Sequence, residues 1–176
     1  PVKTRNAHFE YDGPVMDSSR GPMISTPVVA KHLLHQQKLK IVEALFEKSP
    51  FNCYAGEAMP ELLIITSSAC FLYAEEAVEM LGLQKRIGIL KLGTTWPLPQ
   101  KLLEKYLRKT KKILIVEEVM SFLEENVKVL ASGMASRIGV KTFFGKYDAT
   151  LPAAGELNPD IVAEALGKIL KVKRRA

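Results

Sequence analysis

The clearest structural signal in this chain is Ile113-Leu114-Ile115-Val116-Glu117-Glu118, followed after two residues by Ser121-Phe122-Leu123-Glu124. Four consecutive apolar residues indicate a short strand that is buried on both faces, as in a parallel sheet. Ser121, with Glu124 three residues later, predicts a capping box that starts a helix. A strand that passes directly into a helix is the repeating unit of α/β folds.

The same alternation extends to both sides of this segment. The predicted strands span residues 62–66, 87–92, 113–116 and 140–144. Each is separated from the next by an amphipathic helical pattern, which is typical of βαβ units. We therefore expect an α/β fold with three layers: a mostly parallel sheet of about five strands with helices on both faces.

Several residues mark where the predicted helices begin and end. Ser67 or Ser68 is expected to cap the helix after the first strand, and Gly82 to end it in a left-handed conformation. Gly133 is expected to end the helix that follows Ser121. Asn158-Pro159-Asp160 predicts the start of the last helix, because it combines a cap, a first-turn proline and an N-terminal acid.

The chain divides into three predicted regions. Residues 1–26 are rich in Pro, Gly, Ser and Asp and show no periodicity, which indicates an extended arm or inter-domain linker. Residues 27–60 are expected to form a linker helix, starting at Thr26-Pro27 and ending before Pro50, and then a loop. Residues 61–176 are expected to form the α/β domain.

Composition limits the class of protein. The chain has 176 residues, of which 47% are hydrophobic, and this suits a single globular domain with an arm. Two cysteines are too few for a disulfide framework, and an iron–sulfur cluster needs four ligands, so we expect reduced thiols and no cluster in this chain. No apolar run approaches the roughly 18 residues of a membrane span, and no signal-type segment opens the chain, so we expect a cytoplasmic protein without membrane contact.

A net charge of +6 raises the possibility of a nucleic-acid or acidic partner. The basic residues gather in the terminal segment 168–175 and around one predicted helix. The helix and the turn after it carry Lys101, Lys105, Arg108, Lys109, Lys111 and Lys112. Because no aromatic residues are interleaved as a stacking platform, a solvated helix face is favoured and nucleic acid is the less favoured partner. A free-standing module that binds an acidic partner or RNA stays open as an alternative.

Ligands and partners of α/β sheets meet the loops at the carboxyl ends of the strands. The candidate interface or ligand-facing residues there are Thr66, Ser67, Ser68, Gly93, Thr94, Thr95, Trp96, Glu117 and Glu118. The first three lie at a helix start that could receive a small anion, although plain capping is favoured. Trp96 is either an interface anchor or a plug against the domain's own core.

Other residue types give no catalytic or metal site. Glu117 and Glu118 are adjacent on an extended chain and point to opposite sides, so they are not an acid–base dyad. A structural role is favoured, in which one binds backbone amides or a partner domain and the other faces solvent. His32 and His35 lack a third ligand and are interpreted as a surface pair. No phosphate-binding glycine motif appears, and Asp12-Gly13 lacks the context of a thiamine diphosphate and magnesium site.

The segments Ile89 to Pro99 and Ile113 to Glu118 resemble the transketolase C-terminal-like domain of 2-oxoacid oxidoreductases. A strand, a Lys91-Leu92-Gly93 turn, a Trp96-Pro97-Leu98-Pro99 loop and a Val116-Glu117-Glu118 strand end follow one another in that family's order. Residues 145–160 and 49–52 are also similar, so the resemblance covers about residues 26–170. More specifically, the chain resembles the large subunit of indolepyruvate ferredoxin oxidoreductase.

The resemblance implies a parent enzyme that oxidatively decarboxylates aryl-2-oxoacids to acyl-CoA and passes electrons to ferredoxin. It implies that thiamine diphosphate, Mg²⁺ and 4Fe-4S clusters are bound outside this chain and that coenzyme A is a co-substrate. No catalytic residue carries over. The expected role is positional, with contacts to other domains of the same polypeptide, a smaller partner subunit and ferredoxin.

Overall fold

The computed structural model describes residues 28–172. Its elements in chain order are α1 (Val28–Phe46), β1 (Cys53–Gly56), β2 (Leu62–Thr66), α2 (Cys70–Met80), β3 (Ile87–Lys91), α3 (Gln100–Leu107), β4 (Lys112–Val116), α4 (Phe122–Gly133), α5 (Ala135–Ile138), β5 (Thr142–Phe144) and α6 (Pro159–Leu170). The predicted arm at 1–26, the Thr26-Pro27 helix start and the end of the basic tail lie outside the described residues.

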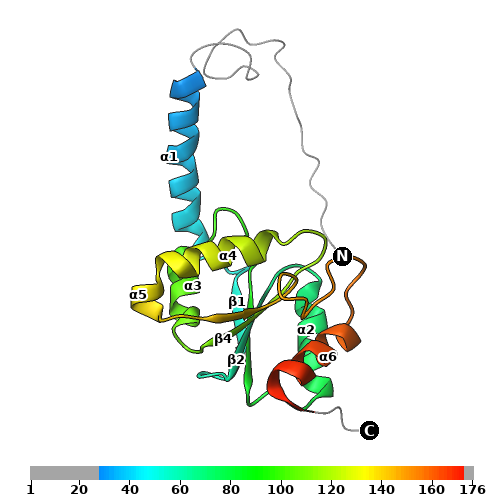
Figure 1. Cartoon of the computed structure of the whole chain (residues 1–176). Helices are drawn as coiled ribbons and strands as arrows, with labels where there is room; N and C mark the ends of the chain where they lie inside the picture. The colour runs from blue at the N-terminus through cyan, green and yellow to red at the C-terminus, as the bar shows by residue number, and fades with distance from the viewer. Residues whose placement is uncertain (1–27, 173–176) are drawn as a thin grey trace, which may run out of the picture. The chain divides into compact units, whose positions relative to one another are not determined.

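The five strands form one sheet in the order β1-β3-β2-β4-β5. Strands β1, β2 and β4 are labelled in Figure 1. Strands β2 to β5 pair in parallel, with Leu62 opposite both Ile87 and Lys112. Strand β1 is the exception, because it runs antiparallel to β3 at the edge of the sheet. The predicted mostly parallel sheet of about five strands is confirmed.

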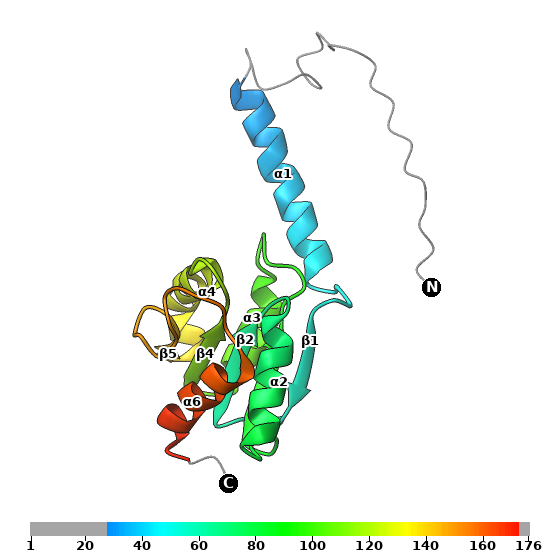
Figure 2. The same ribbon diagram turned by 90° about the vertical axis from the view of Figure 1, so that its right-hand side faces the viewer.

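Helices cover both faces of the sheet, which gives the predicted three layers (Figure 2). Leu62 and Ile64 of β2 pack in the cluster that contains α2 and α6. Leu63 and Ile65 of the same strand pack in the other cluster, with α3, α4 and α5. Successive strand residues point to opposite faces, so a strand covered on both sides must be apolar throughout.

Several predicted helix boundaries are confirmed. The Asn158 side chain accepts a hydrogen bond from the Ile161 backbone N–H at 2.9 Å and caps α6, with Pro159 at the first helical position. Gly82 has φ +64°, the left-handed conformation predicted for the end of α2. Helix α1 ends at Phe46, before Pro50.

Other details of the prediction are wrong. Residues 53–56 were expected in a loop but form edge strand β1, because the antiparallel partner that defines this strand lies more than thirty positions away in β3. The last strand is shorter than 140–144. Helix α4 does end at Gly133, as predicted, but a second short helix, α5, follows at Ala135 and was not expected.

The sheet and its covering helices belong to one compact unit that begins at Val42, and the earlier part of α1 belongs to another. Within residues 28–172, no helix is both long enough and apolar enough to cross a membrane.

Candidate functional site at the carboxyl edge of the sheet

Three of the predicted loops meet at one edge of the sheet, because β2, β3 and β4 run parallel and end there. The loop after β2 carries Ser67 and Ser68, the loop after β3 runs from Leu92 to Pro99, and the loop after β4 runs from Glu117 to Ser121. We call this edge the carboxyl edge. It is where an open α/β sheet presents residues to ligands and partners.

Thr66, the first predicted site residue, does not reach the surface. Its side chain is fully buried, and its hydroxyl donates a hydrogen bond to the Val116 carbonyl at 2.8 Å. The bond links the ends of β2 and β4. Thr66 therefore holds the carboxyl edge together instead of facing a ligand.

Ser67 and Ser68 line the surface but do not cap α2, so that part of the prediction is wrong. The N-cap residue is Ala69, and no side chain bonds to the first turn. Ser68 takes φ +51°, which turns the chain sharply between β2 and α2. Both serines line a cavity of about 530 Å³ at the ends of β2 and β3. Its other lining residues are Pro50, Phe51, Cys53, Lys91, Leu92, Gly93 and Thr95.

The loop after β3 is fastened by Asn52, a residue whose role the sequence did not reveal. Its side-chain oxygen accepts from the backbone N–H groups of Gly93 and Thr94 at 2.9 and 3.1 Å. Its amide nitrogen donates to the Thr94 hydroxyl at 2.8 Å and to the Phe46 carbonyl at 2.9 Å. Gly93 approaches the backbone so closely that an added Cβ would lie 2.7 Å from the Phe51 carbonyl oxygen. The first half of this loop is thus fixed inside the domain.

Glu117 caps helix α4 from the end of β4. Its carboxylate accepts hydrogen bonds from the backbone N–H groups of Leu123 and Glu124 at 2.6 and 2.8 Å. Burial raises the pKa of the Glu117 carboxyl, and these two N–H groups act in the opposite direction. The predicted capping box is wrong, because the Ser121 side chain makes no capping bond and Glu117 takes its place.

Glu118 and Glu124 bind the long loop before α6. A Glu118 oxygen accepts from the Leu157 backbone N–H at 3.0 Å. Glu124 is only 1% exposed; it accepts from the Lys146 backbone N–H at 2.8 Å and pairs with the Lys128 ammonium at 2.5 Å. The three acidic side chains at and after the end of β4 are therefore occupied within the domain, and none of them is a free general base.

Apolar side chains remain exposed at the same edge. They are Trp96 (58% exposed), Val119 (84%), Met120 (75%) and Phe122 (44%). The Trp96 and Phe122 rings meet edge to face with centroids 6.0 Å apart, so the loops after β3 and β4 contribute to one surface. We call these four residues the apolar patch. Of these four residues only Trp96 was predicted from the sequence, because the exposure of the other three depends on how the turn after β4 folds.

The turn that carries the patch has an unusual backbone. Val119 has φ +64°, a conformation that is rare for a β-branched residue. The Val119 carbonyl accepts a hydrogen bond from the Lys146 ammonium at 3.0 Å, which ties the turn to the loop after β5. Strained backbone of this kind concentrates at functional sites.

The described residues do not fit a metal or cluster cofactor. Within residues 28–172, no group of three His, Cys, Asp or Glu side chains is placed to hold a metal ion. His32 bonds instead to Gln36, at 3.1 Å. Cys70 is buried, and burial raises the pKa of its thiol, with the nearby Glu118 carboxylate acting in the same direction.

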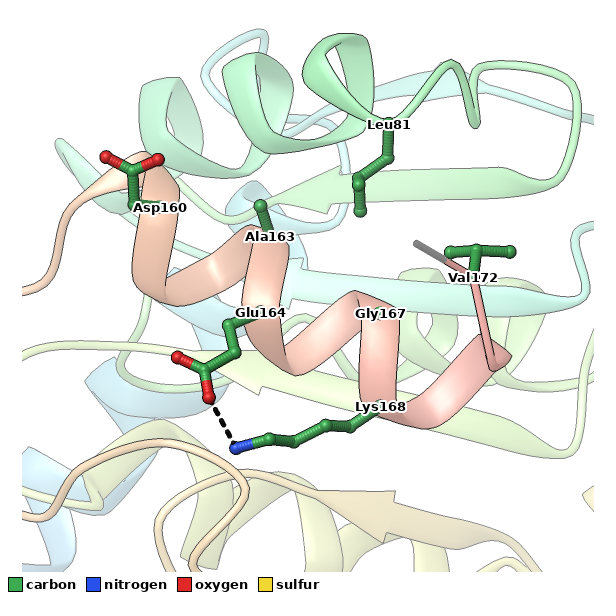
Figure 3. A pocket seen from close by; sticks show the side chains of 7 residues that line it. All are labelled: Leu81, Asp160, Ala163, Glu164, Gly167, Lys168 and Val172. Atoms are coloured by element: carbon green, nitrogen blue, oxygen red, sulfur yellow. Dashed lines mark ion pairs between the residues drawn. The ribbon is translucent and has the colours of Figure 1, made fainter. Parts of the chain in front are cut away.

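A second cavity, of about 500 Å³, lies between α2 and α6 (Figure 3). Leu81, Ala163 and Val172 supply its apolar lining, and Glu164 and Lys168 form an ion pair at its rim with N···O 2.8 Å. Leu81 follows α2 at the opposite edge from the apolar patch. Its charged lining residues are Asp160, Glu164 and Lys168, and the last two are paired with each other.

Comparisons with known proteins match this chain to one group of enzymes. Residues 52–176 match the family model of the indolepyruvate oxidoreductase domain. The indolepyruvate oxidoreductase subunit IorA of Methanothermobacter thermautotrophicus is 33% identical over 147 residues, which are 81% of this chain and 23% of that protein. IorA of Pyrococcus horikoshii is 36% identical over 128 residues, which are 73% of this chain and 19% of that protein.

Among solved structures, the 2-oxoglutarate:ferredoxin oxidoreductase of Magnetococcus marinus, with 2-oxoglutarate, coenzyme A and succinyl-CoA bound, has a TM-score of 0.55 at 15% identity. The match covers 84% of this chain and 24% of that one, and it shows a shared fold. The chain spans less than a quarter of the length of these relatives.

Proposed function

Because this chain belongs to the indolepyruvate oxidoreductase family, we propose that it is one domain of a larger oxidoreductase subunit and that it holds neighbouring domains in position. In this proposal the whole enzyme decarboxylates aryl-2-oxoacids to acyl-CoA and reduces ferredoxin. Thiamine diphosphate, Mg²⁺ and 4Fe-4S clusters bind to the other domains and to a smaller partner subunit. The role of this domain is to position the domains that carry out the reaction.

The observation that carries the proposal is the apolar patch. Several of the polar residues predicted at the carboxyl edge are hydrogen-bonded within the domain. They are Thr66, Glu117 and Glu118. What the edge offers to the outside is a set of exposed apolar side chains, of which Trp96 and Phe122 are in contact. Exposed apolar patches are typical of protein interfaces, and tryptophan is enriched among the residues that dominate interface energy.

The test is the double variant Trp96→Ala/Met120→Ala in the full-length enzyme. It truncates two of the four patch side chains and does not change Asn52 or Glu117. We expect a lower fraction of assembled enzyme by size-exclusion chromatography, or turnover reduced about tenfold or more, because interface anchors contribute roughly 2 kcal/mol or more each.

The matched control is Val129→Ala/Val140→Ala, which truncates two similarly exposed apolar side chains outside the patch. It should leave assembly and turnover unchanged. If the patch variant also assembles and turns over normally, the positional role of this surface is wrong.

A second candidate function is the binding of a small anionic ligand in the 530 Å³ cavity at the ends of β2 and β3. Lys91 supports it, because its ammonium lies at the cavity beside the Phe71 ring, 4.9 Å from the centroid, and forms no ion pair within residues 28–172. Thermal-shift measurements with coenzyme A and with nucleotides test this reading. Ligand binding should raise the melting temperature of the wild type and of the control Lys85→Ala, but not that of Lys91→Ala. If millimolar ligand does not raise the melting temperature of the wild type, this second function is wrong.

A further inference from the structure

Positive charge is concentrated at helix α3 and the turn that follows it. Residues 100–112 contain six Lys or Arg side chains and one acid, Glu104. The segment therefore has a net charge of +5, against +6 for the whole chain. The terminal segment 168–175 also contains five basic residues and no acid, so α3 with its following turn is one of two basic concentrations in the sequence.

Ion pairs inside the domain leave much of this charge uncompensated. Glu104 is shared between Arg108, at 2.6 Å, and Arg137, at 3.1 Å. Glu61 pairs with Lys112 at 3.7 Å, and Glu47 accepts instead from the backbone N–H groups of Lys101 and Leu102 at 2.8 and 2.9 Å. In the part of the chain that the structure describes, four lysines of this segment form no ion pair. They are Lys101, Lys105, Lys109 and Lys111, and we call them the basic face.

Only part of this arrangement stabilises α3: Lys105 lies in the last turn, where a basic side chain complements the helix dipole. Lys101 and Lys105 are four residues apart on one helix, where like charges repel and destabilise the helix by a few tenths of a kcal/mol. The side chains that do stabilise α3 are the buried Leu103 and Leu107 and the Glu47 cap. The lysines are therefore not required to hold α3 on the sheet, and their charge is available to a partner.

A tyrosine pair holds part of the basic face in place. The Tyr54 ring of β1 stacks on Tyr106 of α3 with centroids 4.4 Å apart, and the Lys109 ammonium lies 4.9 Å from both centroids. Tyr54 is itself fixed, because its hydroxyl donates to the Glu57 carbonyl and its ring lies over Gly88, where a Cβ would clash. This contact orders Lys109 in advance and reduces the entropy that docking would cost.

We propose that the basic face is a docking surface for an acidic face of a partner protein. Lysines carry strongly hydrated point charges and steer charged partners over a distance, as in fast and salt-sensitive protein association. Nucleic acid fits less well, because single strands need free aromatic faces for base stacking. Here the two tyrosine rings are partly buried against each other and flanked by Lys109. None of the four lysines belongs to the apolar patch, so the two surfaces are tested independently.

The experiment measures binding of the full chain to fluorescent poly-L-glutamate by anisotropy. It compares salt of roughly 0.1 M, where the screening length is about 10 Å, with roughly 1 M, where it is about 3 Å. The triple variant Lys101→Ala/Lys105→Ala/Lys109→Ala should bind about tenfold or more weakly at low salt. The control Lys38→Ala/Lys40→Ala/Lys85→Ala removes the same charge from exposed sites elsewhere and should change affinity less than about twofold.

Folding of each variant is checked by circular dichroism and melting temperature. Since Lys109 contacts both tyrosines, the double variant Lys101→Ala/Lys105→Ala leaves that contact intact and should still lose about threefold or more in affinity. Equal losses in the basic-face variants and the control would mean that net charge alone drives binding, and the proposal would fall. It would also fall if the wild type did not bind at low salt, or if it bound poly(U) more tightly than poly-L-glutamate.

Discussion

Glu124 is a buried acidic residue that links helix α4 to the loop after β5. Its buried carboxylate bonds to the Lys128 ammonium and to the backbone of Lys146, so helix α4 and the loop after β5 share one acceptor. A buried charge is tolerated only when it is paired and hydrogen-bonded, and both conditions hold here. Because the carboxylate is held by several donors, it cannot move aside for a larger neighbour.

Gly145 is the residue that this arrangement constrains. A Cβ at Gly145 would lie 2.5 Å from a Glu124 carboxylate oxygen. We expect Gly145→Ala to lower the free energy of unfolding by about 1–3 kcal/mol, the usual cost of overpacking a fixed site. Urea denaturation measures the change.

The control for this prediction is Gly133→Ala at the end of α4. No atom lies within 4 Å of a Cβ added there, and the position is helical. Alanine should be neutral or should stabilise the chain by up to about 1 kcal/mol. Equal destabilisation by both substitutions would show that the contact with Glu124 is not the cause.

At the level of secondary-structure elements, two helices on one face of the sheet are capped by carboxylates from outside their own sequence. Glu47 binds the first turn of α3, and Glu117 binds the first turn of α4. Each satisfies two backbone N–H groups that a helix leaves without partners, and each places negative charge at the positive end of the helix dipole. The caps fix both helices, and with them the basic face and the apolar patch, to preceding segments of the chain.

Removal of the α4 cap should destabilise the fold. Glu117→Ala leaves the N–H groups of Leu123 and Glu124 buried without an acceptor, and we expect a loss of about 1–3 kcal/mol in the free energy of unfolding. Glu118→Ala removes only one hydrogen bond, to a half-buried site, and serves as the milder control. A loss from Glu118→Ala as large as that from Glu117→Ala would contradict the capping role.

The same residue gives a pH dependence with a definite sign. Burial raises the pKa of Glu117 above its ordinary value of 4.5, so the folded chain takes up this proton more readily than the unfolded chain. The associated stability is fully present below pH 4.5 and is lost as the pH rises through the raised pKa. The difference in stability between wild type and Glu117→Ala should therefore shrink as the pH rises from about 4 to about 7. A difference that grows over this range would refute the shift.

On the scale of the whole molecule, two regions of the described surface carry side chains that do not contribute to the packing of the domain. The apolar patch lies at the carboxyl edge, and the basic face lies along α3. A domain that occupies less than a quarter of its relatives' length would need surfaces of both kinds if it positions larger neighbours and receives a charged partner. In this view the domain is a connector, and its chemistry consists of packing and electrostatic attraction.

The sequence by itself determined the class of fold and most of the elements. Runs such as Leu62-Leu63-Ile64-Ile65 are apolar at every position, and only a strand covered on both faces places each of them in a core. Local chemistry also fixed the ends of some helices, as at Gly82 and Asn158, because those signals act between residues close in the chain. The order of motifs around Trp96 and Glu117 was enough to indicate the family.

Only the tertiary structure decided what the carboxyl-edge residues do. The sequence favoured structural roles for Thr66, Glu117 and Glu118 without identifying their partners. The structure supplies them: Val116, Leu123 and Leu157. Strand β1 and the Tyr54–Tyr106 stack likewise depend on partners more than thirty residues away. Periodicity and capping signals are local, whereas a hydrogen bond or ring contact between distant segments exists only after the chain has folded, and this is why these roles could not be read from the sequence.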